Sequence, residues 1–502
     1  MVRMTDETDS GVPAALRSVA RGAGAQALGL GTSRVLGFVT TFLLTTSLGA
    51  SLYGIFSFSK TLISIAGTIT NLGTDQSIYR FIPEYEDQET RNRVLGLATL
   101  TSFVGSVVVG LTLYFSAPVL TELTLDQPLL TNALRLFAIA LPFMTLTGCI
   151  ASVFRGLELP GYQIMTGSVG RQVFRLVTVG IVVAVGATLV GIVAAAVVAW
   201  VLAFLFGVGL LTRRTNFWPS LSGSQPSVRR FYNYSVPLTM GDIGRMVQNK
   251  VDILMVGVFL PGAAVGIYNL STVLTQALTV PSIALNTIYP PIAARMYSND
   301  EIDDLESLFT QVTRWSFTLS LLPAIGLIAY SEQLLAVFGE GFGRGEMVLV
   351  LFAVGYFADA ANGPTNYTLM MTDHQYLLMI DRWTVGISNA VLNFIFINRY
   401  GLIGAAFATG LILTTISIVR LVEIWYTEGL VPYSWKFLKP ITAGAACGVV
   451  LTGLEVLSPL TGIALMVVGG LIGTATYVLI LVALGIEPED REFFADVGSR
   501  LT

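Results

Sequence analysis

The chain has 502 residues, of which 53% are hydrophobic and only 12% are charged, and its mean hydropathy is +0.72. These values lie far outside the range of soluble globular domains, and the formal net charge of −4 does not favour nucleic acid as a partner. Because the apolar residues gather in runs of about 20, the sequence predicts an all-α polytopic integral membrane protein. Cys149 and Cys447 both fall inside such runs, so no disulfide framework is expected.

Apolar windows of about 20 residues predict the membrane spans and their order along the chain. Several of the windows contain Gly or Pro, which is usual where helices pack closely or bend around a transport pathway. The fourteen predicted spans are 27–49, 53–75, 94–117, 131–154, 163–186, 188–211, 236–260, 263–291, 309–330, 346–371, 376–397, 401–426, 438–457 and 461–485.

Lys and Arg are divided unevenly between alternate loops. With the N-terminus inside, the inner loops hold most basic residues, and the outer loops offer little beyond Arg344 and Arg399. Basic residues accumulate in cytoplasmic loops, so we expect both termini in the cytoplasm. The inner set is Arg17, Arg21, Arg80, Arg91, Arg93, Arg155, Arg213, Arg214, Arg229, Arg230, Arg295, Lys436, Lys439, Arg491 and Arg500.

The sequence repeats itself at a nearly constant offset, which predicts two related lobes. The matched pairs are Arg34 with Arg245, Gly54 with Gly266 and Gly191 with Gly401, at offsets of 211, 212 and 210 residues. Six spans per copy give both copies the same orientation, so we expect a pseudo-two-fold axis along the membrane normal. The predicted division is a cytoplasmic N-terminus 1–26, an N-lobe 27–211, a cytoplasmic linker 212–235, a C-lobe 236–426, two further spans within 427–485 and a cytoplasmic tail 486–502.

The predicted span 236–260 is unusually polar for a membrane segment. At about 100° per residue, its polar residues fall on one arc of about 160°, and apolar residues fill the opposite arc. A charge at bilayer depth costs about 3 kcal/mol, so these residues should line a hydrated cavity between helices. Alternatively, two buried ion pairs only fix helix packing: Asp242 with Arg245, and Lys250 with Asp252 or with a neighbouring helix. The polar residues are Asp242, Arg245, Asn249, Lys250 and Asp252.

Other spans carry polar residues that also need water, a partner or a substrate. Lys60 and Asp75 lie on a polar stripe of the second span, and Arg34 interrupts the first. Arg34, Lys60, Arg245 and Lys250 are the predicted cations for a substrate phosphate. The predicted cavity-lining or ion-coupling residues are Asp75, Asp242, Asn249, Asp252, Asp359, Asn362 and Asn366.

Other chemistries receive little support from the sequence. There is no GxxxxGK[ST] loop for ATP, and His374, the one histidine, has no second His or Cys nearby to hold a metal. The longest predicted loops, about 212–235 and 292–308, lack a convincing set of catalytic carboxylates, so an enzyme is the weakest class of function. No cofactor is expected, and a coupling ion, Na⁺ or H⁺, remains open.

The span pattern, the motif SRVLGF (Ser33 to Phe38), the motif RFIPEY (Arg80 to Tyr85) and the charged seventh span together resemble a known family. They resemble the polysaccharide flippases of the multidrug/oligosaccharidyl-lipid/polysaccharide exporter superfamily. The resemblance implies two lobes that open alternately to either side of the membrane. Arg34 matches a first-span arginine that follows Ser and is functionally important in the related lipid II flippases.

The resemblance also implies a substrate and a location. The expected substrate is a sugar or oligosaccharide linked to dolichyl or another polyprenyl phosphate, moved across the plasma membrane for surface glycan or glycoprotein assembly. Lys occurs at only four positions and several loops are acidic, which suits the high-salt cytoplasm of an archaeal source, although high genomic GC content alone also replaces Lys by Arg. The expected assembly is a monomer among membrane lipids, working with glycosylation-pathway enzymes.

An ion-coupled multidrug exporter of the same superfamily is the alternative. Asp242, Asp252 and Asp359 keep this alternative open, because such exporters are expected to depend on buried carboxylates. Cations in the cavity would repel cationic drugs, which favours the flippase.

Overall fold

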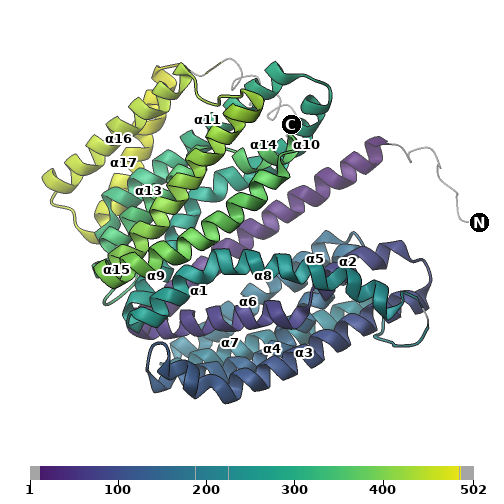
Figure 1. Ribbon diagram of the computed structural model, residues 1–502. Coiled ribbons are helices and arrows are strands. Elements are labelled where there is room, and N and C mark those ends of the chain that lie inside the picture. Colours follow the sequence, from purple (N-terminus) through teal and green to yellow (C-terminus); the bar gives the residue numbers. More distant parts are fainter. Residues whose placement is uncertain (1–11, 187, 224, 486, 488–502) are drawn as a thin grey trace, which may run out of the picture. The chain divides into compact units, whose positions relative to one another are not determined.

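A computed structural model describes residues 12–186, 188–223, 225–485 and 487 of the chain (Figure 1). Every regular element in these residues is a helix, which confirms the all-α prediction. The chain forms two compact units, Met1–Gly266 and Ile267–Thr502, which are described separately below. Of the predicted cytoplasmic ends, 1–11 and most of 486–502 lie outside the described residues, and 12–26 are helical.

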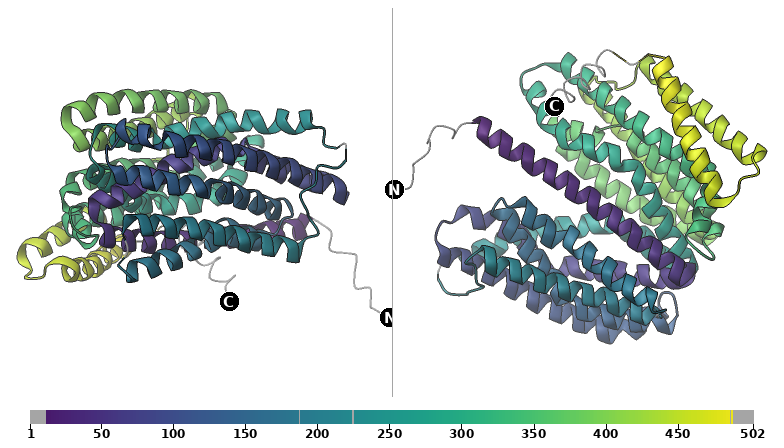
Figure 2. Two further views of the ribbon diagram at one scale, coloured as in Figure 1. Left: turned by 90° about the horizontal axis from the view of Figure 1, so that it is seen from below. Right: turned by 180° about the vertical axis from the view of Figure 1, so that it is seen from behind.

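The first unit contains the helices of the predicted N-lobe and the charged seventh span. One cluster of buried side chains, including Phe81, Phe154 and Phe231, joins α2, α4 and the start of α8. Figures 1 and 2 show α3 and α4 running side by side. The helices are α1 (Val12–Asn71), α2 (Thr74–Glu84), α3 (Gln88–Glu122), α4 (Pro128–Gly156), α5 (Pro160–Gly167), α6 (Val169–Ala184), α7 (Leu189–Arg214) and α8 (Val228–Phe259).

The first two predicted spans form one long helix with a single break. The break in α1 is at Gly49, whose φ of 65° lies in the left-handed region that favours glycine. One residue therefore replaces the loop that the sequence placed between 49 and 53.

Gly54 and Gly266, which the repeat matched to each other, pack together in the first unit. A Cβ on Gly54 would lie 1.7 Å from the carbonyl oxygen of Gly262, and a Cβ on Gly266 would lie 2.1 Å from that of Ala50. Small residues four apart on both helices allow this close backbone approach. The repeated glycines thus have a packing role where α1 meets α9 (Gly262–Thr275).

The predicted linker 212–235 ends inside a helix. Residues 215–227 connect α7 to α8 and are tied to the start of α3, since Ser220 N donates to Asn92 O at 3.0 Å. Because α8 packs against α1 and α2, it belongs to the first compact unit, although the sequence assigned it to the C-lobe. The pseudo-two-fold relation between 27–211 and 236–426 stays a prediction.

The second unit contains the remaining spans. Two further helices that the sequence placed outside the repeat, α16 and α17, lie side by side in Figure 2. Tyr477 of α17 fixes them to α11 by donating its hydroxyl to Thr318 O at 2.9 Å. The elements are the end of α9, η1 (Gln276–Thr279), α10 (Val280–Ser298), α11 (Ile302–Ala329), α12 (Ser331–Val337), η2 (Gly343–Gly345), α13 (Glu346–Ala361), α14 (Thr365–Met371), α15 (Gln375–Glu428), η3 (Trp435–Phe437), α16 (Leu438–Leu457) and α17 (Gly462–Ala483).

Each of the fourteen predicted spans lies mainly on helix in the described residues, and three of them, 53–75, 163–186 and 346–371, are interrupted by short non-helical turns. Eleven helical segments are long and apolar enough to cross a membrane, and two of them, in α1 and α15, each contain two predicted spans. The break in α15 is at Gly401, with a φ of 61°. α8 is not among the eleven because of its charges. Large apolar side chains face outward, such as Phe115 at 73% exposure, as a lipid-facing surface requires. The protein is therefore a multi-pass membrane protein.

Candidate functional site

The candidate site begins at a helix break within the predicted span 163–186. α5 ends at Gly167, Ser168 is not helical, and α6 begins at Val169. Gly170 permits the two helices to meet this closely, because a Cβ there would lie 2.0 Å from Met165 O. Discontinuous membrane helices often form substrate sites in transporters, because their free ends can face a cavity.

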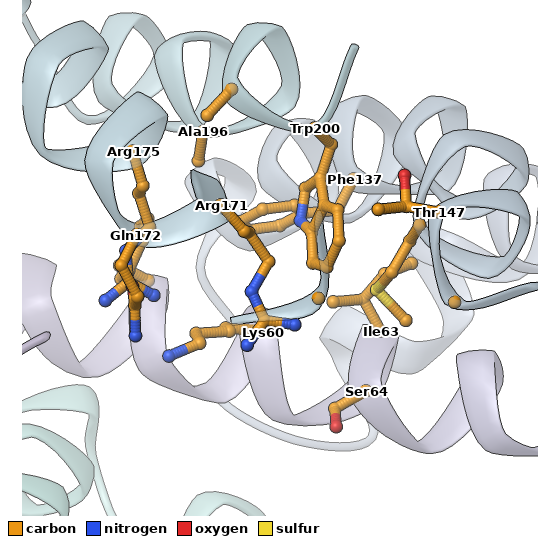
Figure 3. A pocket seen from close by; sticks show the side chains of 15 residues that line it. Lys60, Ile63, Ser64, Phe137, Thr147, Arg171, Gln172, Arg175, Ala196 and Trp200 are labelled. Atoms are coloured by element: carbon orange, nitrogen blue, oxygen red, sulfur yellow. The ribbon is translucent and has the colours of Figure 1, made fainter. Parts of the chain in front are cut away.

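A cavity of about 350 Å³ lies at this break, within the first unit (Figure 3). The first two turns of α6 contribute Arg171, Gln172 and Arg175, and the second half of α1 contributes Lys60. Figure 3 shows the polar ends of these four side chains directed into one space. The other lining residues are Phe56, Ile63, Ser64, Phe137, Met144, Thr147, Gly148, Gly167, Ala196, Ala199 and Trp200.

The cavity is strongly cationic. Lys60, Arg171 and Arg175 line it, and none of the described residues that line it is acidic. The start of α6 adds the partial positive charge of a helix N-terminus. Three cations at bilayer depth cost about 9 kcal/mol at 3 kcal/mol each on insertion scales, unless water or an anion offsets them. The arrangement therefore suits an anionic ligand.

Some hydrogen-bonding capacity in the cavity is unused. Arg175 Nε and Gln172 Oε1 are buried and have no hydrogen-bond partner in the described part of the chain. The Arg171 guanidinium lies over the Trp200 ring, 5.1 Å from its centroid, which holds the guanidinium in place without using all of its donors. The donors of Arg171 and Arg175 remain able to bind the oxygens of a phosphate.

Of the four predicted phosphate cations, Lys60 lines this cavity, and the other three lie elsewhere in the first unit. Arg34 is exposed on the first half of α1. Gly37, one turn later, lies close to α6, because a Cβ added to Gly37 would lie 3.2 Å from Gln172 Nε2. Arg34 therefore lies on the stretch of α1 that faces α6, although it is not among the lining residues.

On α8, the Arg245 guanidinium forms an ion pair with the Asp242 carboxylate, as the alternative reading of this span predicted. The Arg245 side chain is 67% exposed, so the pair is not a deeply buried one. Asn249 is exposed, and Lys250 is partly buried.

Two predicted carboxylates accept hydrogen bonds from the backbone of the next residue. Asp75 accepts from Gln76 N at 2.9 Å, and Asp252 accepts from Ile253 N at 2.8 Å. Both are only partly buried. Neither is among the residues that line the cavity.

The predicted residues Asp359, Asn362 and Asn366 belong to the second unit. Ser417 Oγ donates to Asp359 Oδ1 at 3.3 Å, and the Tyr433 hydroxyl donates to Asn362 Oδ1. Asn366 is partly buried on α14. Burial raises the pKa of Tyr433, which lies between α15 and η3, to about 12, so its hydroxyl stays protonated at neutral pH.

Arg171 and Arg175 were not predicted, although a signal for them was present. Both lie inside the predicted span 163–186, four residues apart on one helix face, with Gln172 beside them. The charge cost that singled out Arg34 applies to them equally. The described residues contain no group of three or more His, Cys, Asp or Glu side chains that could hold a metal ion.

Comparison with known proteins identifies the family. The model of the polysaccharide biosynthesis protein family matches residues 19–296, more than half of the chain. The chain belongs to this family. The predicted family resemblance is therefore confirmed.

Two relatives from the archaeon Haloferax volcanii carry the names of flippases. "Probable low-salt glycan biosynthesis flippase Agl15" is 26% identical over 197 residues, which are 38% of this chain and 42% of the relative. "Probable flippase AglR" is 23% identical over 469 residues, which are 92% of this chain and 94% of the relative.

One solved structure has a fold similar to that of this chain. The structure titled "Lipid II flippase MurJ, inward closed conformation" matches with a TM-score of 0.71 at 14% identity, covering 91% of this chain and 97% of that one. At this identity the likeness concerns the fold. These similar proteins carry the names of flippases, which favours a transporter over an enzyme.

Proposed function

We propose that the protein is a flippase that moves a lipid-linked sugar or oligosaccharide across the membrane by alternating access. The observation that carries this proposal is the cationic cavity, in which Lys60, Arg171 and Arg175 face one space with no acidic residue among the described lining residues. The names of the Haloferax relatives support the same class of function.

The chemistry of the substrate explains the charges. A lipid phosphate that crosses the bilayer keeps at least one negative charge, and fixed cations must offset the hydration that it loses. Arginine suits this role because its planar donors bind two phosphate oxygens at once and it stays protonated. Trp200, Phe56 and Phe137 give the same cavity aromatic walls, which can pack against the apolar face of a sugar ring.

The finer proposal follows the family and the sequence. The lipid is dolichyl or another polyprenyl phosphate, the membrane is the plasma membrane, and the product serves surface glycan or glycoprotein assembly. We further propose that the protein acts as a monomer with both termini in the cytoplasm, together with glycosylation-pathway enzymes. An exporter of cationic drugs is disfavoured, because the cavity would repel its substrates.

Neutralising the cavity tests the proposal. Lys60→Gln, Arg171→Gln and Arg175→Gln keep polar side chains and remove the charge. A hydrogen bond to a charged group contributes about 1.5–3 kcal/mol, so each change should weaken substrate binding by about 10- to 100-fold. The assay follows lipid-linked saccharide reaching the outer leaflet of cells that depend on the variant, together with membrane abundance.

A matched control keeps the interpretation specific. Arg213→Gln removes an exposed charge at the end of α7 and should leave transport unchanged. Normal surface glycosylation by a triple variant that combines Lys60→Gln, Arg171→Gln and Arg175→Gln, at wild-type abundance, would refute the proposal. Accumulation of charged lipid carrier on the inner side, with abundance unchanged, would support it over drug export.

A further inference from the structure

A second set of charged side chains lies inside the second unit and has no part in the cavity described above. The set joins α13 to both halves of α15. It consists of Asp359 on α13, Asp381 on α15 before the break at Gly401, and Arg420 and Glu423 on α15 after that break. Arg420 Nε and Asp381 Oδ2 are 3.1 Å apart, and their side chains are only 14% and 5% exposed. The ion pair therefore connects two adjacent membrane spans through a buried contact.

Glu423 lies three residues after Arg420, on the same face of α15. Its carboxyl group lies close enough to that of Asp381 for the two to interact electrostatically. Its Oε2 atom is buried and has no hydrogen-bond partner among the described residues. An ionised carboxylate only accepts hydrogen bonds, so two ionised carboxylates in contact repel each other and leave acceptors unused. A proton on one of them supplies the missing donor.

The charge balance points the same way. Asp359 of α13 also faces Arg420 and accepts a hydrogen bond from Ser417 Oγ. Three carboxyl groups thus share one guanidinium, and full ionisation would leave two uncompensated negative charges between helical segments that are long and apolar enough to cross a membrane. Glu428, at the end of α15, has a different partner, His374 Nδ1 at 3.3 Å.

We propose that Asp381 and Glu423 bind one proton between them and form the proton site of this transporter. The ligand is a proton and not Na⁺, because the Arg420 guanidinium beside these carboxyl groups would repel a metal cation. Trp383 and Trp425, each two residues from one of the carboxyl groups, are 66% and 60% exposed. Exposed tryptophans mark the boundary between membrane and water, so protons reach the site over a short path.

The site also has a way to act on the structure. When the shared proton leaves, the Glu423 carboxylate competes with Asp381 for Arg420. The competition changes the contact between the two halves of α15, and Asp359 transmits the change to α13. Proton binding itself does not depend on the transported molecule. Its coupling to lipid transport rests on the proposed function.

Carbodiimide labelling tests the site directly. Dicyclohexylcarbodiimide adds to a protonated carboxyl group in an apolar environment and not to a carboxylate anion, and mass spectrometry locates the adduct. The purified full chain is labelled in detergent over a series of pH values. We expect labelling at Glu423 or Asp381 at neutral pH, with a labelled fraction that falls as the pH rises.

Isosteric variants sharpen the result. Glu423→Gln should abolish labelling at Asp381, since the remaining carboxylate then pairs with Arg420 as an anion. Asp381→Asn should reduce labelling at Glu423 for the same reason. Glu332→Gln, at an exposed position in the first turn of α12, should change neither. The proposal is overturned if neither residue is labelled at any pH while acid-denatured protein is labelled, or if the remaining carboxyl group in both variants reacts as it does in the wild type.

A second assay separates this inference from the proposed function. In vesicles with an imposed pH gradient, wild-type lipid transport should accelerate severalfold, and Glu423→Gln should not respond. Labelling with no response to the gradient would overturn the coupling. Labelling with no lipid transport under any condition would leave the proton site intact and overturn the flippase function.

Discussion

Replacing Gly170 by alanine tests how the cavity is built. The added Cβ would lie 2.0 Å from Met165 O, which is a backbone atom of α5 and cannot rotate away. A carbon and a carbonyl oxygen pack at about 3.3 Å or more, so α5 and the start of α6 must separate by about 1.3 Å. Arg171 is the next residue, and this shift moves it relative to Lys60.

The size of the effect follows from two opposing contributions. Forcing one extra carbon into a closely packed contact costs about 1–3 kcal/mol. An alanine at an open helical position instead gains up to about 1 kcal/mol over glycine. Gly180 provides that reference on the same helix, because nothing lies within 4 Å of its added Cβ. The two variants should therefore differ by about 1–4 kcal/mol in the free energy of unfolding.

The assay is thermal unfolding of the purified protein in detergent, with transport measured at a temperature where both variants stay folded. Gly170→Ala should unfold several degrees below the wild type and transport more slowly. Gly180→Ala should match or exceed the wild type in both respects. Equal unfolding temperatures and equal transport for the two variants would refute the close contact between α5 and α6.

Three further predictions concern other parts of the chain. Arg245→Ala should lower the unfolding free energy by less than about 1 kcal/mol, because the Arg245 side chain is 67% exposed and its pair with Asp242 is therefore screened by solvent. Lost abundance that is restored by also removing Asp242 would instead show a packing role. Asp87 caps α3 by accepting from Thr90 N at 2.7 Å, and hydrogen bonding to the Thr90 side chain, and next to its backbone N–H, lowers the pKa of the Asp87 carboxyl group. A carboxyl group whose pKa is lower in the folded state than in the unfolded state stabilises the fold at neutral pH, and this stabilisation is lost as the pH falls through the folded-state pKa. The difference in unfolding temperature between the wild type and Asp87→Ala should therefore shrink in acid. A difference that stays constant with pH would contradict the capping role. Cysteines at the exposed positions of Leu123 and Gln225 test the orientation: an impermeant outside reagent should label the first and not the second, and the reverse result would overturn it.

The helices could be predicted from the sequence because the length of an apolar run is set by the thickness of the bilayer. The breaks were harder to predict. Gly49 and Gly401 break continuous helices close to where the sequence predicted loops. The sequence alone does not distinguish a glycine that adopts a positive φ from a glycine that allows close helix packing.

The candidate site was predicted only in part. Lys60 was identified by the cost of its charge, whereas Arg171 and Arg175 passed unnoticed in a span that otherwise looked apolar. Asp242 and Arg245 satisfied the same charge criterion, yet they pair with each other one turn apart. Charge cost selects residues that need a partner, and only the spatial arrangement shows whether that partner is a neighbouring side chain or a ligand.

Direct binding to the purified protein tests the central claim, that the cations of this cavity hold the phosphate of a lipid-linked sugar. A polyprenyl phosphate sugar is titrated into the wild type and into Lys60→Gln/Arg171→Gln/Arg175→Gln at low and high salt, with the uncharged polyprenol as control. The account predicts that the triple variant loses at least about 100-fold in affinity for the phosphate, that much of the salt dependence disappears with the charges, and that polyprenol binding is unchanged. Equal affinity of the two proteins for the lipid phosphate would contradict it.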